Sequence, residues 1–339
     1  MQARRVARVG LLVAVGAAAG YLLYRARGIL PPFLAALALS YLLEPAVEWL
    51  VRRRLGRAWA VLAVFAVVGA VFALFFGFLG PGLVDELSRL VAALPGLAGD
   101  LERLISAAQR GFARAPLPLG LRAAVEHAVA TLESGLAVFL GSLAQGAVGF
   151  FSGFLTLLLA PVLSFYMLKD LPRFRYSLIN AIPRAHRDEV LKLVSEVDRG
   201  LGSFVRGQLT VALIVAALVT FGLLVVAAPF ALLFGVIAGL AETVPILGPF
   251  IGATPAVVVA LARSPLLALK VALVFAAVQQ IEAAFIAPRV IGGRLGLHPL
   301  VVIFAILAGG RLFGFWGVFL AVPAIAAGRP IVRYLARKL

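Results

Sequence analysis

The stretch from Ala241 to Ala256 reads AETVPILGPFIGATPA, with three prolines, two glycines and a glutamate inside a long apolar run. Each proline removes a backbone donor and disfavours the helical conformation in the residue before it. Irregular backbone at membrane depth persists only where protein or a water-lined cavity satisfies its polar groups. Broken apolar segments of this kind are the best sequence-level pointer to a transporter's binding site. We therefore expect this stretch to be the working part of a membrane protein.

The composition is that of a polytopic membrane protein. Of 339 residues, 63% are hydrophobic and only 14% are charged, with a mean hydropathy of +1.07. A soluble domain is about half apolar and about a quarter charged. The net charge of +16 does not indicate nucleic acid, because the basic residues cluster at the ends of apolar segments, as the positive-inside bias predicts. The absence of cysteine excludes disulfides, thiol nucleophiles and cysteine metal sites. The expected partner is the lipid bilayer.

Six apolar stretches predict transmembrane helices, which need about 20 residues each. They are 9–24, 29–51, 58–80, 148–168, 207–228 and 265–287. Arg52, Arg53, Arg54 and Arg57 lie between the second and third stretches, and the positive-inside bias places them in the cytoplasm. With six spans, both termini then fall on the cytoplasmic side.

Two less apolar regions interrupt the spans. Residues 81–147 carry a helical stripe of leucine and valine and should lie outside the cytoplasm, whereas 169–206 is rich in lysine and arginine and should lie inside. We expect the stripe to pack against other helices or subunits, or to lie on the membrane surface. The predicted regions are N-terminal transmembrane helices (1–80), an extracytoplasmic amphipathic region (81–147), a transmembrane helix (148–168), a cytoplasmic helical segment (169–206), a transport core (207–328) and a basic tail (329–339).

Four further apolar stretches are too short to cross a bilayer. They are 230–244 and 250–262, which flank the proline-rich turn, and 299–308 and 312–327, which flank GGRLFG. Two re-entrant helical hairpins, at 230–262 and 299–327, explain these lengths better than four truncated helices. The first hairpin would enter from outside and the second from inside, so that together they would close a site with alternating exits. The fold class is thus an all-α polytopic membrane protein with six spans and two re-entrant hairpins; the alternative is eight or more tilted or kinked spans.

The candidate site residues are polar groups in the apolar C-terminal half. Glu242 and Glu282 are intramembrane carboxylates. Burying a charged side chain near the bilayer centre costs free energy, so we interpret both residues as functional. Glu242 would couple proton movement to hairpin opening, bind a cation beside freed carbonyls, or cap unwound backbone. Gln279 and Glu282 are three residues apart and share a helix face, with Gln280 on a neighbouring face. This polar stripe would line the pathway or hydrogen-bond adjacent helices.

Other residues are expected to shape the hairpins. The prolines and glycines that open the backbone and allow close helix approach are Pro245, Gly248, Pro249, Gly252 and Pro255 in the first hairpin, and Gly309, Gly310, Gly314 and Gly317 in the second. Gln208 would help to hold a hairpin. Arg311, at the second tip, would meet an anionic or polyhydroxyl substrate or lie in a cytoplasmic loop.

Several segments resemble one family. They are FYMLKD (165–170), FVRGQL (204–209), ETVPILGPFIGATPA (242–256), QQIEAAFIAPRVIGGRLGLHPLVV (279–302) and GGRLFGFWGVFLAVPA (309–324). The chain resembles the autoinducer-2 exporter family of bacterial permeases over nearly its whole length. The resemblance implies membrane transport, a homo-oligomer and a place in the bacterial inner membrane. One member is linked to export of a quorum-sensing furanone and others are described as sodium(lithium)/proton antiporters, so the resemblance defines no ligand.

These observations favour a secondary transporter over an enzyme. The sequence has no HExxH, GxSxG or GxxxxGK[ST] motif, and its three histidines are scattered. We expect alternating access that exports a small polar, signalling-molecule-like solute or exchanges sodium or lithium for protons. No cofactor or metal is expected beyond proton or sodium coupling. A passive channel or a structural membrane scaffold is the alternative.

Overall fold

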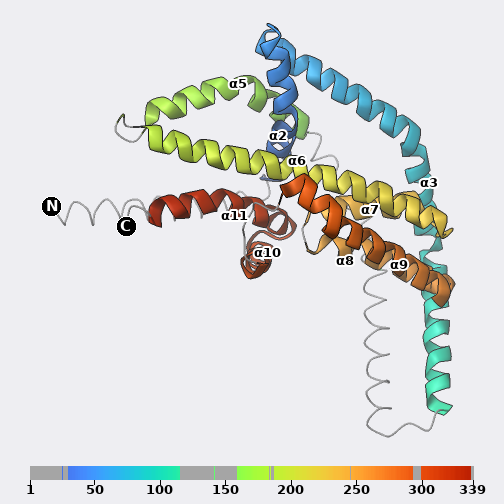
Figure 1. Ribbon diagram of the computed structural model, residues 1–339. Coiled ribbons are helices and arrows are strands. Elements are labelled where there is room, and N and C mark those ends of the chain that lie inside the picture. Colours follow the sequence, from blue (N-terminus) through green and yellow to red (C-terminus); the bar gives the residue numbers. More distant parts are fainter. Residues whose placement is uncertain are drawn as a thin grey trace. The chain divides into compact units, whose positions relative to one another are not determined.

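The structure, a computed structural model, describes residues 25, 30–114, 141, 159–182, 184, 187–244, 246–292 and 299–336. Every regular element in these ranges is helical, which confirms the all-α fold class. The elements are α2 (Leu30–Arg52), α3 (Arg57–Arg114), α5 (Leu159–Ala181), α6 (Arg187–Val225), α7 (Ala231–Glu242), α8 (Gly248–Arg263), α9 (Pro265–Ile281), the π-helical turns η2 (Glu282–Ile286) and η3 (Pro288–Gly292), α10 (Pro299–Phe313) and α11 (Phe315–Ala336) (Figure 1).

Four helical segments in the described ranges are long and apolar enough to cross a membrane. They are α2, the Arg57–Leu104 part of α3, α6, and the segment Pro265–Val290 that begins with α9. These segments contain the spans predicted at 58–80 and 265–287 and nearly all of those at 29–51 and 207–228. The predicted span 9–24 lies outside the described residues. So does the first part of 148–168, whose last part falls in α5.

Two helices run through boundaries that the sequence suggested. The 58 residues of α3 continue past Pro81 and Pro95, so the predicted start of an extracytoplasmic region at 81 lies within one helix. At 1.5 Å per residue α3 is about 87 Å long, against a hydrocarbon core of about 30 Å, so part of it must project beyond the core. Similarly, α6 joins the end of the predicted cytoplasmic segment 169–206 to the span predicted at 207–228 without a break. The remainder of 81–147, apart from residue 141, lies outside the described residues.

The chain divides into two compact units, each assembled from separate stretches of sequence. The first unit comprises Met1–Val67, Phe154–Arg206 and Arg294–Leu339, and the second comprises Val68–Gly153 and Gly207–Gly293. Both α3 and α6 therefore contribute residues to each unit. The hairpin α7–α8 belongs to the second unit and the pair α10–α11 to the first.

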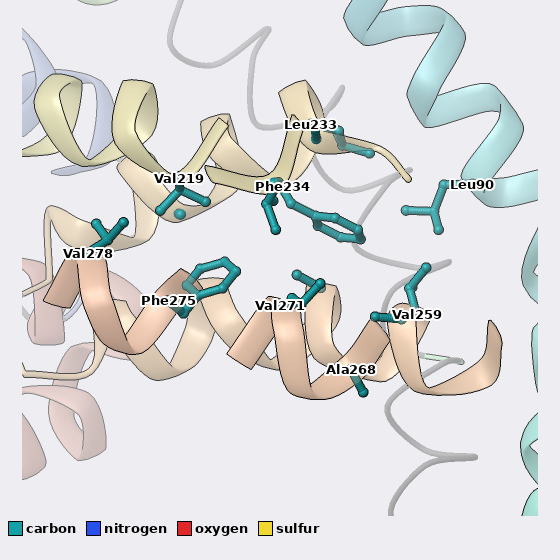
Figure 2. Close-up of a cluster of buried hydrophobic side chains, with 14 of the residues drawn as sticks. Leu90, Val219, Leu233, Phe234, Val259, Ala268, Val271, Phe275 and Val278 are labelled. Carbon is teal, nitrogen blue, oxygen red and sulfur yellow. The ribbon is translucent and has the colours of Figure 1, made fainter. Parts of the chain in front are cut away.

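The core of the second unit is built mainly from α6, α7, α8 and α9. Its most completely buried large side chains are Val211, Val219, Leu223, Phe234, Val259 and Val271. Figure 2 shows Val219, Phe234, Val259 and Val271 of this set. Leu90, Leu97 and Leu101 of α3 belong to the same cluster, so part of the leucine stripe packs within the chain. Because lipid tails are as apolar as these side chains, close packing contributes more than exclusion of water to helix association at membrane depth.

A polar network in the first unit ties α2, α5 and α6 together. The Arg175 Nη2 donates to Glu44 Oε1 at 3.2 Å and to Asp198 Oδ2 at 3.1 Å. The Tyr41 hydroxyl donates to Asp198 Oδ1 at 3.0 Å, and Arg206 Nη1 donates to the Tyr41 carbonyl at 3.0 Å. One guanidinium therefore neutralises two carboxylates that come from different helices.

Replacing Arg175 with methionine is expected to lower the free energy of unfolding by about 1 kcal/mol, because two linked ion pairs are lost and two carboxylates are left facing each other. Thermal unfolding in detergent micelles measures the change. Arg173→Met is the matched control, because its guanidinium is 86% exposed and pairs with Asp170 at 3.6 Å within the same helix. Equal destabilisation by the two substitutions would show that the network contributes nothing.

Candidate functional site

A helical hairpin lies at the proline-rich stretch. The 12 residues of α7 and the 16 residues of α8 are each shorter than the roughly 20 needed to cross a bilayer. The two helices pack against each other. Ile246 in the turn and Phe230 before α7 have positive φ angles of 72° and 57°, which non-glycine residues rarely adopt. The backbone is thus irregular at both ends of α7.

Small residues bring α8 close to α7. A Cβ on Gly252 would lie 2.8 Å from Ala238 Cα, and one on Gly248 would lie 2.7 Å from Glu242 Cα. Pro249 occupies the first turn of α8, where a missing donor is tolerated, and Pro255 is buried within the helix. Pro245, predicted to shape the same turn, lies outside the described residues.

Glu242 is the last residue of α7 and only 5% of it is exposed. Its backbone carbonyl accepts a hydrogen bond from Gln208 Nε2 on α6, which ties the end of α7 to that helix. In the described ranges no hydrogen bond or ion pair reaches the Glu242 carboxylate. Gln208 is 6% exposed, and its Oε1 is buried without a donor there. Where α6 packs against the C-terminal end of α7, the Gln208 Oε1 and the Glu242 carboxylate therefore both lack a hydrogen-bond donor in the described ranges.

The second carboxylate stands at a distortion of its own helix. Glu282 begins the π-helical turn η2, and such turns are frequent at functional sites. Gln279 Nε2 donates to Glu282 Oε2 at 2.7 Å, so the two predicted neighbours do meet. Gln280 lies on an exposed face instead.

Glu86 of α3 is a site residue that the sequence analysis missed. Its Oε2 accepts a hydrogen bond from the backbone nitrogen of Leu233 at 2.7 Å. Leu233 lies in the first turn of α7, and the residue before α7, Phe230, provides no side-chain cap. An acidic group favours this position because the first amides of a helix lack internal partners and carry partial positive charge. Glu86 therefore fixes the N-terminal end of the helix that ends at Glu242.

A glycine pair on α7 was also missed. Gly235 and Gly239 form the GxxxG pattern GVIAG and face α6, where a Cβ on Gly239 would lie 2.6 Å from the Ala212 carbonyl oxygen. A Cβ on Gly235 would overlap Thr220 Oγ1. GxxxG lets helices approach closely in membranes, so this pair was detectable from the sequence.

The second predicted hairpin is formed by α10 and α11 in the first unit. Gly309 and Gly317 meet so closely that a Cβ on either would overlap the carbonyl oxygen of the other, and Gly314 makes the turn with φ of 63°. A Cβ on Gly310 would lie 3.0 Å from Val318. Arg311 is exposed near this turn. Unlike the predicted second arm at 312–327, α11 continues to Ala336 and includes part of the basic tail.

Long apolar helices, short packed hairpins and buried polar groups together define a polytopic α-helical membrane protein. Residues 11–337 match the family described as "AI-2E family transporter". The chain belongs to this family, as the resemblance predicted, and the family is one of transporters and permeases.

The curated relatives carry names of the same kind. The chain is 30% identical to "Putative transport protein YrrI" of Bacillus subtilis, over 90% of this chain and 86% of that protein. It is 33% identical to "Putative transport protein MT0215" of Mycobacterium tuberculosis, over 88% of this chain and 80% of that one. It is 26% identical to "Putative permease PerM" of Escherichia coli, over 93% and 89% of the two chains.

Proposed function

We propose that this protein is a secondary transporter of the bacterial inner membrane, with both termini cytoplasmic. It exports a small polar solute, or exchanges sodium or lithium for protons, by alternating access. The observation that carries the proposal is the Glu242 carboxylate, which is buried at the end of a short hairpin helix without a donor in the described ranges. Because an uncompensated charge at membrane depth is costly, we infer that Glu242 exchanges a proton or a cation rather than only capping the end of α7.

Glu242 is placed to couple its charge state to the hairpin. Its backbone carbonyl is held by Gln208, while its buried carboxylate has no hydrogen-bond donor in the described ranges. Adding a proton to the carboxylate removes the cost of burying its charge. The packing of α7 against its neighbours therefore differs between the loaded and unloaded states. In our proposal α7–α8 is a re-entrant hairpin that opens in one state and closes in the other.

The other expected residues take supporting roles in this proposal. Gln279 restrains the Glu282 carboxylate through a hydrogen bond, and the glycines of α8 allow α7 and α8 to pack closely. Gln280 and Arg311 are both exposed, and we assign them to the solute pathway only if their substitution changes solute affinity. We expect the working protein to be a homo-oligomer.

The proposal is tested with the purified protein in liposomes that hold a pH-sensitive dye. An imposed proton gradient is followed while sodium or lithium is added, and Glu242→Gln, Glu282→Gln and the double variant are compared with wild type. We expect proton-dependent exchange to fall to the level of empty liposomes in Glu242→Gln and the double variant. Glu102→Gln, an exposed glutamate on α3, is the control and should retain full activity.

Two outcomes would overturn the proposal. If all three variants keep wild-type, pH-dependent transport, the carboxylates do not couple protons to transport. If ion conductance persists without any gradient dependence, the protein is a passive channel. If neither cation moves while export of a polar solute still requires the proton gradient, the exporter form of the proposal stands.

A further inference from the structure

The connection between α2 and α3 concentrates positive charge beside aromatic side chains. It holds Arg52, Arg53, Arg54 and Arg57, with no lysine among the basic residues. Within this group, Arg52 pairs with Glu48 at 3.9 Å, and the arginine side chain is 83% exposed. In the described ranges Arg53 and Arg54 form no ion pair, so the connection carries a surplus of positive charge.

The backbone of this connection is strained at Arg54, which has a left-handed conformation. Leu55 N donates to the Leu50 carbonyl and Arg54 N donates to the Val51 carbonyl, a pattern that closes a helix C-terminus around one left-handed residue. That residue is Arg54, with φ of 69°. Glycine is the usual choice at this position because it has no Cβ, so an arginine there is retained at a cost in stability. Such strain is characteristic of functional sites.

Two tryptophans set the depth of the connection in the membrane. Trp49 and Trp59 lie on either side of it, are 56% and 70% exposed, and are two of the chain's three tryptophans. Exposed tryptophan is enriched at the level of lipid headgroups. The Arg53 guanidinium stacks over the Trp49 ring at 4.7 Å, which leaves its N–H edges free to bind an oxyanion.

Arg57 anchors the site to the rest of the first unit. Its Nε donates to the Leu168 carbonyl at 2.7 Å, whereas its Nη2 is buried without an acceptor in the described ranges. Lys169, next in sequence to Leu168, lies 6.0 Å from the Tyr166 ring and adds a further positive charge. Asp170, the residue after Lys169, pairs its side chain with Arg173 at 3.6 Å. Arg57 therefore keeps one buried N–H group without an acceptor in the described ranges.

We propose that the α2–α3 connection is a binding site for the phosphate headgroup of an anionic phospholipid, held by Arg53 and Arg54 between Trp49 and Trp59. Guanidinium groups match phosphate oxygens in a bidentate geometry that a lysine cannot reproduce. Surplus charge, a strained arginine and flanking tryptophans at headgroup depth all favour this occupant. The site is independent of Glu242 and of the transport chemistry.

Quenching of tryptophan fluorescence by brominated lipids tests the proposal. The full chain carrying Trp316→Phe, which leaves Trp49 and Trp59 as reporters, is reconstituted with brominated phosphatidylglycerol or brominated phosphatidylcholine at equal mole fractions. We expect stronger quenching by the anionic lipid. In Arg53→Gln/Arg54→Gln the preference should weaken on the order of tenfold or more, because the charge-assisted hydrogen bonds from two guanidinium groups to the phosphate are lost.

Three further variants distinguish a specific lipid-binding site from non-specific electrostatic attraction to anionic lipid. Arg89→Gln/Arg103→Gln removes two charges from exposed arginines elsewhere on α3 and should keep the preference. Arg53→Lys/Arg54→Lys keeps the charge but should lose most of the preference. Arg54→Gly should raise the melting temperature, because it relieves the left-handed backbone, while weakening the preference for anionic lipid.

The proposal is overturned if the two lipids quench equally in the wild-type background, or if the lysine pair behaves as wild type. It is also overturned if Arg89→Gln/Arg103→Gln loses the preference as fully as Arg53→Gln/Arg54→Gln. Abolition of the preference by inorganic phosphate at millimolar concentration would assign the site to a soluble anion instead.

Discussion

Gly239→Ala is expected to destabilise the second unit by about 3 kcal/mol, although alanine is the better helix former. A Cβ at Gly239 would lie 2.6 Å from both the Ala212 carbonyl oxygen and the Ala216 Cβ, so α7 and α6 would have to separate. Overpacking a close contact of this kind costs about 1–3 kcal/mol. Because the contact is between backbones rather than flexible side chains, we expect the upper end of that range.

Gly77→Ala is the matched control, because Gly77 lies on an exposed face of α3 and a Cβ there would meet nothing within 4 Å. There alanine should stabilise by up to about 1 kcal/mol through helix propensity alone. Unfolding of the purified protein in detergent, followed by circular dichroism, gives both values. The test is that the two substitutions change the free energy of unfolding in opposite directions. A stabilising Gly239→Ala would mean that α6 and α7 do not pack as closely as the structure shows.

Local signals in the sequence predict the apolar spans and the broken hairpin. Apolar length indicates whether a segment can cross the bilayer, and a dense cluster of prolines and glycines indicates where the helix is interrupted, so both can be read without tertiary structure. The α7–α8 hairpin lies where Pro249, Gly248 and Gly252 interrupt the apolar run. The pairing of Gln279 with Glu282 was likewise visible, because residues three apart share a helix face.

Features that depend on contacts distant in sequence could not be predicted. Pro81 looks like a boundary, yet α3 continues through it. Nothing in the spacing of Gln208 indicates that its amide reaches the Glu242 carbonyl, 34 residues further along the chain. The sequence does not distinguish Glu86 from the other charged residues of 81–147. The amide that it caps belongs to Leu233, 147 residues away. The division into interleaved units follows from such contacts and not from composition.

Glu86→Ala is expected to release the N-terminal end of α7 and to cost about 1–3 kcal/mol, the penalty for leaving a buried backbone donor unsatisfied. The hydrogen bond from Leu233 N to Glu86 Oε2 is 2.7 Å long, and α7 has no cap of its own at that end. Glu86→Gln keeps a carbonyl oxygen in the same place and should restore most of the loss. Asp85→Ala, which removes a surface ion pair to Arg89 on the same helix, should cost at most about 1 kcal/mol.

Hydrogen–deuterium exchange over residues 231–242 distinguishes this local role from general destabilisation. In Glu86→Ala the amides of the first turn of α7 should exchange faster, while those of α9 stay protected, because only one end of the helix has lost its partner. Transport should fall with the loss of protection, since Glu86 and Gln208 hold opposite ends of the helix that carries Glu242. Unchanged exchange in α7, or equal effects of Glu86→Ala and Asp85→Ala, would show that Glu86 does not position the hairpin.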